Sequence, residues 1–254
     1  MARYISLAQL HKFETITEAL EENGRRINIL CRIGGDDFNK LAGRLMDCCE
    51  GIKACNSLAC KLCNRQYRLK RVDDLVTLIH TKKRRWWVVT IVEYSRAFPF
   101  EDLDSLDVQK SKDRLRKLLE RSGMEGPIVG SFEIDYHEAC GLWLPHYHLL
   151  FPSTLQNRQA KENLRKKVIK QQPHHIKRNK PARPIKFQRL KRPYTQISYN
   201  YKLVSNAVRD YECRRTGKMR TKKYRLADEM FCRSLCWMDR IGRRRLLFSF
   251  GERD

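Results

Sequence analysis

The chain has 254 residues and carries 53 Lys and Arg against 29 Asp and Glu, a net charge of +24. Its hydrophobic share of 41% is enough to bury a core, which excludes a wholly disordered chain. No apolar run reaches the ~18 residues that cross a bilayer, and the N-terminus lacks the apolar segment of a secretion signal, so we expect a cytoplasmic protein with no membrane partner. The positive charge favours a polyanionic partner, and nucleic acid is the best candidate.

A helical region and a cysteine-dense segment come first. Apolar residues recur at helical spacing over residues 4–47, with a break at Gly34 and Gly35. The cysteines that follow are expected to be thiols or metal ligands rather than disulfides, because no export signal precedes them. Their C-x2-C spacing lets two thiolates chelate one Zn²⁺ while others complete a tetrahedron. The predicted structural zinc ligands are Cys49, Cys55, Cys60 and Cys63, with Cys48 as a substitute for Cys49, His80 as a distant possibility, and reduced core cysteines as the metal-free alternative.

The rest of the chain alternates between strands and helices, which is an α+β pattern. The predicted elements are, in order, a strand over 86–95, a helix over 105–121, strands over 128–137 and 144–151, helices over 158–171 and 194–209 with a proline-punctuated loop over 173–193 between them, and a final helix and short strand within 225–250.

Two histidines stand two residues apart in the strand over 144–151. His146 and His148 therefore point to one face of the strand, where both can bind the same metal ion. A hairpin turning about residues 140–141 would place Glu133 opposite His148 and Asp135 opposite His146, on that same face. Two imidazoles and a carboxylate suit Mg²⁺, Mn²⁺ or another divalent ion. The alternative is a pair of surface histidines on an edge strand.

One tyrosine of the helix predicted over residues 193–209 is available for chemistry. At 100° per residue, Tyr201 falls in the apolar stripe with Ile197, whereas Tyr199 projects from the opposite face near Lys202. A phenolate beside a metal-bound phosphate is a competent nucleophile. Tyr199 is therefore the predicted nucleophile, and Tyr201 is predicted to lie in the core.

The positive charge is concentrated over residues 158–192, which hold 14 Lys and Arg and one Glu. Such a run is usually a solvated face, but this many like charges favour contact with a polyanion. The candidate DNA contacts are Arg165, Lys166, Lys167, Lys170, Lys177 and Arg178, with Arg209 from the next predicted helix.

The order of the strand VVTIVEYS, the hairpin ending in PHYHLL and the helix with ISYNYKLVSN resembles the HUH (His-hydrophobe-His) endonucleases, over roughly residues 86–210. Within them it most resembles rolling-circle replication initiators of bacterial plasmids and phages. The resemblance implies a ferredoxin-like antiparallel sheet with helices on one face, and a Mg²⁺ or Mn²⁺ ion held by His146, His148 and a third ligand. That ligand is Glu133, with Asp135 in reserve. Tyr199 is then the nucleophile and Lys202 the cation beside it.

The resemblance also implies an activity. The tyrosine of such enzymes cuts one DNA strand, which leaves a 5′-phosphotyrosine link and a free 3′-OH that starts rolling-circle replication in the bacterial cytoplasm. The expected partners are single-stranded or supercoiled origin DNA with a separate helicase and polymerase, since the sequence has no phosphate-binding GxxxxGK[ST] motif. Leu203 stands where phage-type initiators have a second tyrosine, so a single-tyrosine enzyme is expected.

Two alternatives and a domain division complete the predictions. A transposase or relaxase would share the chemistry, and a non-catalytic zinc-containing DNA-binding regulator would explain the charge and the cysteines. The expected domains are a small helical and zinc-binding module over 1–84, a nicking domain over 85–210, and a C-terminal helix and strand over 211–254 that pack on it.

Overall fold

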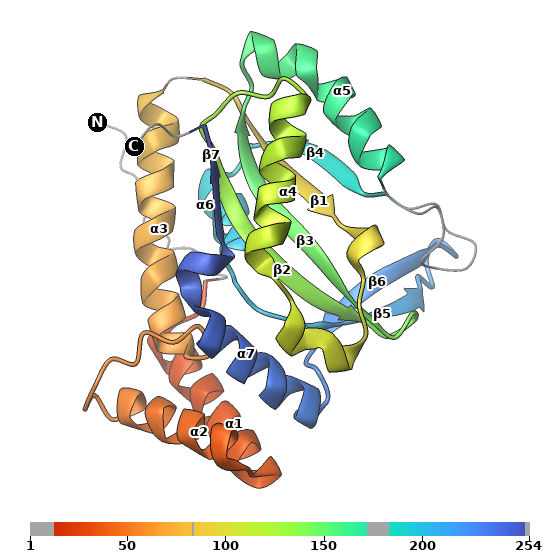
Figure 1. Cartoon of the computed structure of the whole chain (residues 1–254). Helices are drawn as coiled ribbons and strands as arrows, with labels where there is room; N and C mark the ends of the chain where they lie inside the picture. The colour runs from red at the N-terminus through yellow and green to blue at the C-terminus, as the bar shows by residue number, and fades with distance from the viewer. Residues whose placement is uncertain (1–12, 83, 172–182, 252–254) are drawn as a thin grey trace. The chain divides into compact units, whose positions relative to one another are not determined.

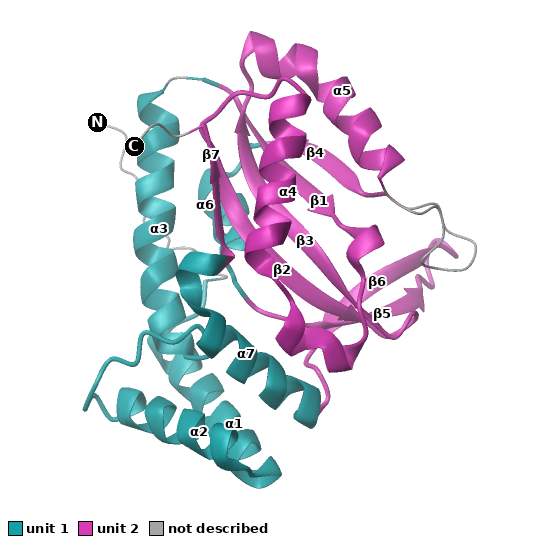
Figure 2. Ribbon diagram, viewed as in Figure 1, with its two compact units in different colours: residues 1–84, 190–203, 228–245 teal, residues 85–189, 204–227, 246–254 magenta. Residues whose placement is uncertain are grey.

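The computed structural model describes residues 13–82, 84–171 and 183–251 and has an α+β fold (Figure 1). Two compact units divide it (Figure 2). Unit 1 comprises Met1–Arg84, Leu190–Leu203 and Asp228–Arg245, and unit 2 comprises Arg85–Arg189, Val204–Ala227 and Leu246–Asp254. Two later segments, Leu190–Leu203 and Asp228–Arg245, group with the N-terminal helices. The units are therefore discontinuous in sequence, unlike the three consecutive domains that the sequence predicts.

Unit 1 is helical. Its helices are α1 (Ile16–Ile33), α2 (Asp36–Cys49), α3 (Lys61–Thr81), α6 (Pro193–Asn200) and α7 (Asp228–Leu246), the last of which ends at the boundary with unit 2. Thr15 and Glu18 form a capping box that begins α1. The chain breaks between α1 and α2 at Gly34 and Gly35, whose φ angles of 73° and 114° favour glycine. The predicted break is thus confirmed.

Helix α3 is an element that the sequence analysis missed. Its second half has an apolar stripe, in which Val72, Leu75, Val76 and Ile79 are buried at helical spacing. Its first half is polar and follows directly on the cysteines, so the apolar period is visible over only two turns. Buried Asn64 lies in that polar half, where its side chain donates a hydrogen bond to the carbonyl of Lys202.

Unit 2 is built on one curled sheet. The strands are β1 (Trp86–Val92), β2 (Ile128–His137), β3 (Leu142–Pro152), β4 (Ile185–Arg189), β5 (Ala207–Glu212), β6 (Met219–Tyr224) and β7 (Leu247–Phe250). Their order is β4-β1-β3-β2-β5-β6, and β7 also pairs with β2. The sheet is mixed, because β5 runs parallel to β2, so the predicted fully antiparallel sheet is wrong. Two short 3₁₀ helices, Tyr94–Arg96 and Phe100–Ser105, follow β1.

Two helices of unit 2 cover one face of this sheet. They are α4 (Val108–Arg121) and α5 (Leu155–Lys170). The hydroxyl groups of Ser111 on α4 and Tyr147 on β3 lie 2.7 Å apart, and the ammonium of Lys161 on α5 lies over the rings of Trp87 and Phe187. Tyr147 and its neighbours thus form the helix-covered face, and the histidines that alternate with Tyr147 point to the other.

The predicted helix over residues 194–209 is wrong beyond its first half. Helix α6 ends at Asn200, Leu203 has a φ of +47°, and residues 207–212 form β5. Valine at 208 is β-branched and becomes buried by pairing with His137 in the sheet. Strand pairing therefore overrides the weak helical period of this segment. The predicted loop over 173–193 likewise contains β4, which pairs with β1.

Gly130 permits the close pairing of β2 and β3. A Cβ added there would lie 2.0 Å from the carbonyl oxygen of His148 and 2.8 Å from the Cα of Leu149. We predict that Gly130→Ala lowers the free energy of unfolding by about 1–3 kcal/mol, because the two backbones must move apart. Thermal or denaturant unfolding of the purified variant measures the effect.

Gly43→Ala is the matched control. Gly43 lies inside α2 with nothing within 4 Å of an added Cβ, so alanine should stabilise the helix by about 0.5–1 kcal/mol. Equal stability of Gly130→Ala and the parent protein would contradict the close approach of β2 and β3.

Candidate metal centres

The hairpin of β2 and β3 brings a carboxylate and two imidazoles onto one face of the sheet. Glu133 pairs with His146 and Ser131 pairs with His148. The predicted pairing of Glu133 with His148 and Asp135 with His146 is therefore shifted by two residues, because the turn occupies residues 138–141 and Gly141 is its last residue rather than its centre. A shift of two keeps every side chain on its face, so the predicted face is correct.

Glu133, His146 and His148 form a buried group whose atoms can hold one metal ion. Oε2 of Glu133 lies 3.8 Å from Nε2 of His146 and 3.6 Å from Nε2 of His148. Two ligands bound at about 2.1 Å to one ion lie at most about 4.2 Å apart, and both distances meet that limit. All three side chains are less than 10% exposed. A shared cation would offset the cost of burying this carboxylate.

Neighbouring groups orient both imidazoles. Nδ1 of His146 lies 3.1 Å from the carbonyl oxygen of Leu144, which can only accept, so Nδ1 donates and the neutral ring has its lone pair on Nε2. Nδ1 of His148 lies 3.3 Å from the hydroxyl of Thr90 on β1. The sequence analysis missed both supporting groups, because Leu144 acts through its backbone and Thr90 comes from a distant strand.

Asp135, the reserve ligand, has other partners. Its Oδ1 accepts hydrogen bonds from the backbone and side-chain amides of Asn206, at 3.0 and 2.9 Å, and its Oδ2 lies 2.6 Å from the ammonium of Lys223. Oδ2 also lies 3.7 Å from Nε2 of His146. The structure therefore groups Glu133 with the two histidines and gives Asp135 the role of joining β2 to the segment around β5 and β6.

The predicted nucleophile lies at the end of α6, in unit 1. Tyr199 is 48% exposed, whereas Tyr201 is fully buried, as its predicted place in the core requires. The ammonium of Lys202 lies 4.2 Å from the centre of the Tyr199 ring, a cation–π contact. Lys202 lies beyond the end of the helix, so a bend in the chain, rather than the predicted helical spacing, brings it to the ring.

The predicted DNA contacts lie at several places. Arg165, Lys166 and Lys170 are exposed on α5, and the guanidinium of Arg165 lies 3.6 Å from the Glu162 carboxylate. Lys167 is half-buried and bonds to the carbonyl of Arg121. The remaining predicted contacts are Lys177 and Arg178, which fall outside the described residues, and Arg209, which lies on β5 and pairs with Glu138 at 2.7 Å.

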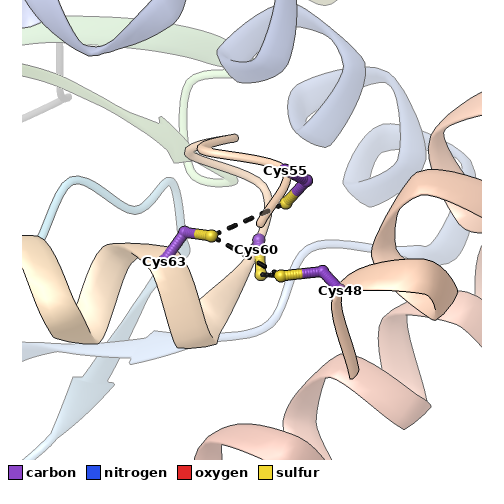
Figure 3. A group of neighbouring side chains, drawn as sticks. All are labelled: Cys48, Cys55, Cys60 and Cys63. Atoms are coloured by element: carbon purple, nitrogen blue, oxygen red, sulfur yellow. Dashed lines mark hydrogen bonds between the residues drawn. The ribbon is translucent and has the colours of Figure 1, made fainter. Parts of the chain in front are cut away.

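The second group that can hold a metal ion consists of Cys48, Cys55, Cys60 and Cys63 (Figure 3). The sulfur atoms of Cys48 and Cys63 lie 3.6 Å apart, and the Cys55–Cys63 and Cys48–Cys60 distances are 3.7 Å. Four sulfurs at 2.3 Å from a tetrahedral ion would lie about 3.8 Å apart. The measured separations match that geometry.

The structure groups Cys48, the predicted substitute, rather than Cys49 with the other three cysteines. The two residues are adjacent in the last turn of α2, where successive side chains diverge by about 100°, so only one can face the group. The sulfur of Cys49 instead accepts a hydrogen bond of 3.4 Å from the buried amide of Asn23, which also donates to Cys60. His80 lies at the other end of α3.

The thiols interact strongly. Hydrogen bonds from Cys55 and Cys63 hold the pKa of the Cys60 thiol well below its ordinary value, and the same interaction raises the pKa of Cys55 well above it. Cys60 is the one fully buried residue of the group. A divalent cation among the four sulfurs would offset the charge of thiolate ligands.

Helix α3 connects this cysteine group with the tyrosine segment, and both belong to unit 1. Cys63 stands in the first turn of α3, and the next residue, Asn64, donates a hydrogen bond of 2.9 Å to the carbonyl of Lys202. One turn later, the guanidinium of Arg68 donates to the hydroxyl of Ser198 at 2.8 Å. Sequence reasoning missed Asn64 and Arg68, although polar residues four apart directly after a C-x2-C pair are a visible signal.

Comparison with known proteins adds no relatives, since no protein family, curated protein or solved structure matches the chain. Among the described residues, no helix is both long and apolar enough to cross a membrane.

Replacing single cysteines tests the composition of the group. We predict that Cys48→Ser loses bound metal and lowers the melting temperature of unit 1, because one ligand of four is removed. Cys49→Ser should keep the metal, because its sulfur only accepts a bond from Asn23. Metal analysis of both purified variants measures this. Retention by Cys48→Ser with loss by Cys49→Ser would reverse the assignment.

Removal of the metal from the cysteine group should loosen the tyrosine segment. The first turn of α3 holds both Cys63 and the amide that bonds to Lys202, so we predict faster hydrogen exchange over residues 198–203 after chelation. Exchange over α4, which holds no residue of either metal-binding group, is the internal control. Unchanged exchange at 198–203 in fully metal-free protein would show that α3 keeps its position without the ion.

Proposed function

We propose that the chain is a metal-dependent tyrosine DNA endonuclease and strand transferase of the HUH type, with a ferredoxin-like catalytic core. It nicks one strand at a replication origin and initiates rolling-circle replication of a plasmid or phage. The observation that carries this proposal is the buried group of Glu133, His146 and His148, with its Nε2 and Oε2 atoms 3.6–3.8 Å apart on the two central strands. The Tyr199 and Lys202 pair supports it.

In this proposal Glu133, His146 and His148 hold Mg²⁺ or Mn²⁺. Such an ion polarises the scissile phosphate and neutralises charge that develops on it. The contacts of His146 with Leu144 and of His148 with Thr90 keep both imidazoles in the orientation that ligation needs. Asp135 stays bonded to Lys223 and Asn206.

Tyr199 supplies the nucleophile. A bond forms between its phenol oxygen and the phosphorus as the bond from phosphorus to the 3′ oxygen breaks, which leaves a 5′-phosphotyrosine and a 3′-hydroxyl. The phenol proton passes to solvent, and the leaving 3′ oxygen takes up a proton. The ammonium of Lys202, which lies beside the ring, stabilises negative charge on the attacking group. The proposal requires unit 1 and unit 2 to act on the same phosphodiester.

The other parts of the chain support the same function. The exposed cations of α5, among them Arg165, Lys166 and Lys170, hold the phosphates of single-stranded or supercoiled origin DNA. A structural Zn²⁺ in the cysteine group stabilises unit 1. A separate helicase and polymerase complete replication in the bacterial cytoplasm.

The test is formation of a covalent protein–DNA adduct. Labelled single-stranded DNA from the chain's own genetic element is incubated with protein and Mg²⁺ or Mn²⁺, and denaturing electrophoresis measures the adduct. We predict that EDTA abolishes it and that Tyr199→Phe reduces it to background, since the phenol oxygen is lost. His148→Ala should lower it more than about 100-fold.

Tyr211→Phe is the matched control, because Tyr211 is similarly exposed at 42% and lies on β5. It should form the adduct normally. Tight DNA binding without an adduct or nick in either metal would favour the zinc-containing DNA-binding regulator. An adduct on a transposon end or a conjugative origin alone would assign the same chemistry to a transposase or relaxase.

A further inference from the structure

A cavity of about 710 Å³ lies in unit 2 between β1, α4 and α5. Ile91, which lines it, pairs with Tyr147, whereas its neighbour Thr90 pairs with His148. Paired residues of antiparallel strands share a face, so the cavity lies on the helix-covered face of the sheet. It is thus separate from the group of Glu133, His146 and His148, which occupies the opposite face.

Positive charge dominates the walls of this cavity. Its cationic residues are Arg96, Arg114, Lys117, Arg121 and Lys167. Its one carboxylate, Glu93, accepts a hydrogen bond of 2.5 Å from Ser111. Burial raises the pKa of Glu93 above its usual range.

The cations project from two helices toward the same space. Arg114, Lys117 and Arg121 stand at positions i, i+3 and i+7 on α4, which places them along one side of that helix. Lys167 comes from α5 and bonds to the carbonyl of Arg121. The Nε atom of Arg114 is buried and has no hydrogen-bond partner among the described residues. A buried guanidinium nitrogen of this kind indicates a site for an acceptor such as a phosphate oxygen.

The rest of the lining is uncharged, and Ser95 and Gln171 are its polar residues. Ile91, Leu115, Leu118 and Val168 contribute side chains between the cations. A volume of 710 Å³ lies within the ~300–1,000 Å³ range of small-molecule sites. An apolar floor beside a row of cations matches a ligand that has a flat, weakly polar part and a phosphate, which is the composition of a nucleotide.

We propose that the α4–α5 cavity binds a nucleoside phosphate, either one unit of a DNA strand or a free nucleotide. The phosphate contacts Lys117 and Arg121, with Arg114 beneath it, and the base or sugar lies on Leu118 and Val168. The site is independent of Tyr199 and of the metal group, so it adds a second point of nucleic-acid contact on the other face of the sheet.

Binding of a fluorescein-labelled oligothymidylate in EDTA, measured by anisotropy at several salt concentrations, tests this site without cleavage. The variant is Lys117→Gln/Arg121→Gln, which changes two exposed side chains. Two lost phosphate contacts should reduce the slope of log K against log salt by about 1.4 and the affinity at 0.1 M salt by about 25-fold.

The control variant is Lys110→Gln/Arg220→Gln, which removes one lysine and one arginine from exposed positions of unit 2 outside the cavity. Its slope should stay unchanged. Thymidine 5′-monophosphate is then added to each protein. A free nucleotide is identified as the ligand if thymidine 5′-monophosphate displaces the strand or raises the melting temperature in every protein except the Lys117→Gln/Arg121→Gln variant. A difference seen with the strand alone identifies a strand.

Equal behaviour of the two double variants toward both probes would overturn the proposal, because the cavity would then contribute only net charge. Adduct formation by the same variants separates this result from the proposed nicking activity. If the two double variants show equal slopes but form the adduct normally, only the proposed nucleotide site in the cavity is refuted. If their slopes differ but no protein forms an adduct, only the proposed nuclease activity is refuted.

Discussion

Strands β2 and β3 pair along almost their whole length, and every other strand of the sheet joins this hairpin directly or through one neighbour. Gly130 permits the two backbones to approach closely beside His148. The hairpin has two different faces. Phe132 and Tyr147 face the helices, and Glu133, His146 and His148 are buried on the other side. Burial of a carboxylate between two imidazoles is unfavourable unless a proton or a cation compensates its charge. The pairing that builds the sheet therefore also brings together a group of side chains that can hold a metal ion.

Alternation along strands was readable from the sequence, because period-2 patterning depends only on neighbouring residues. It gave the limits of β2 and the common face of His146, His148 and Glu133. The predicted register of β2 against β3 differs from the observed one by two residues. The length of the turn between His137 and Leu142 depends on a backbone conformation that the sequence indicates only weakly.

Contacts between distant segments were not readable. Strand β5 has a helical period in its sequence, yet it pairs with β2 because that pairing buries Val208. The direction of the last turn of α2 decides that Cys48 rather than Cys49 faces the other cysteines, and the cysteine spacing does not contain that direction. The α4–α5 cavity combines cations from segments about fifty residues apart, of which the sequence analysis identified only Lys167.

Helix α3 has two roles in unit 1. Its first turn contributes Cys63 to the cysteine group, and Asn64 and Arg68 bond to the segment around Tyr199. A metal ion bound at the start of this helix would therefore restrict the backbone around Tyr199. In the proposed function, that ion would hold the segment in place and Tyr199 would supply the nucleophile.

The central claim is that Tyr199 becomes covalently linked to DNA, and mapping the linkage tests it most directly. The adduct is digested with nuclease and trypsin, and the peptide that ends at Lys202 is fragmented in a mass spectrometer. This peptide contains Tyr194, Tyr199 and Tyr201. The account predicts a single 5′-linked nucleotide on Tyr199. A nucleotide on Tyr194, on Tyr201 or on a residue outside this peptide would contradict it.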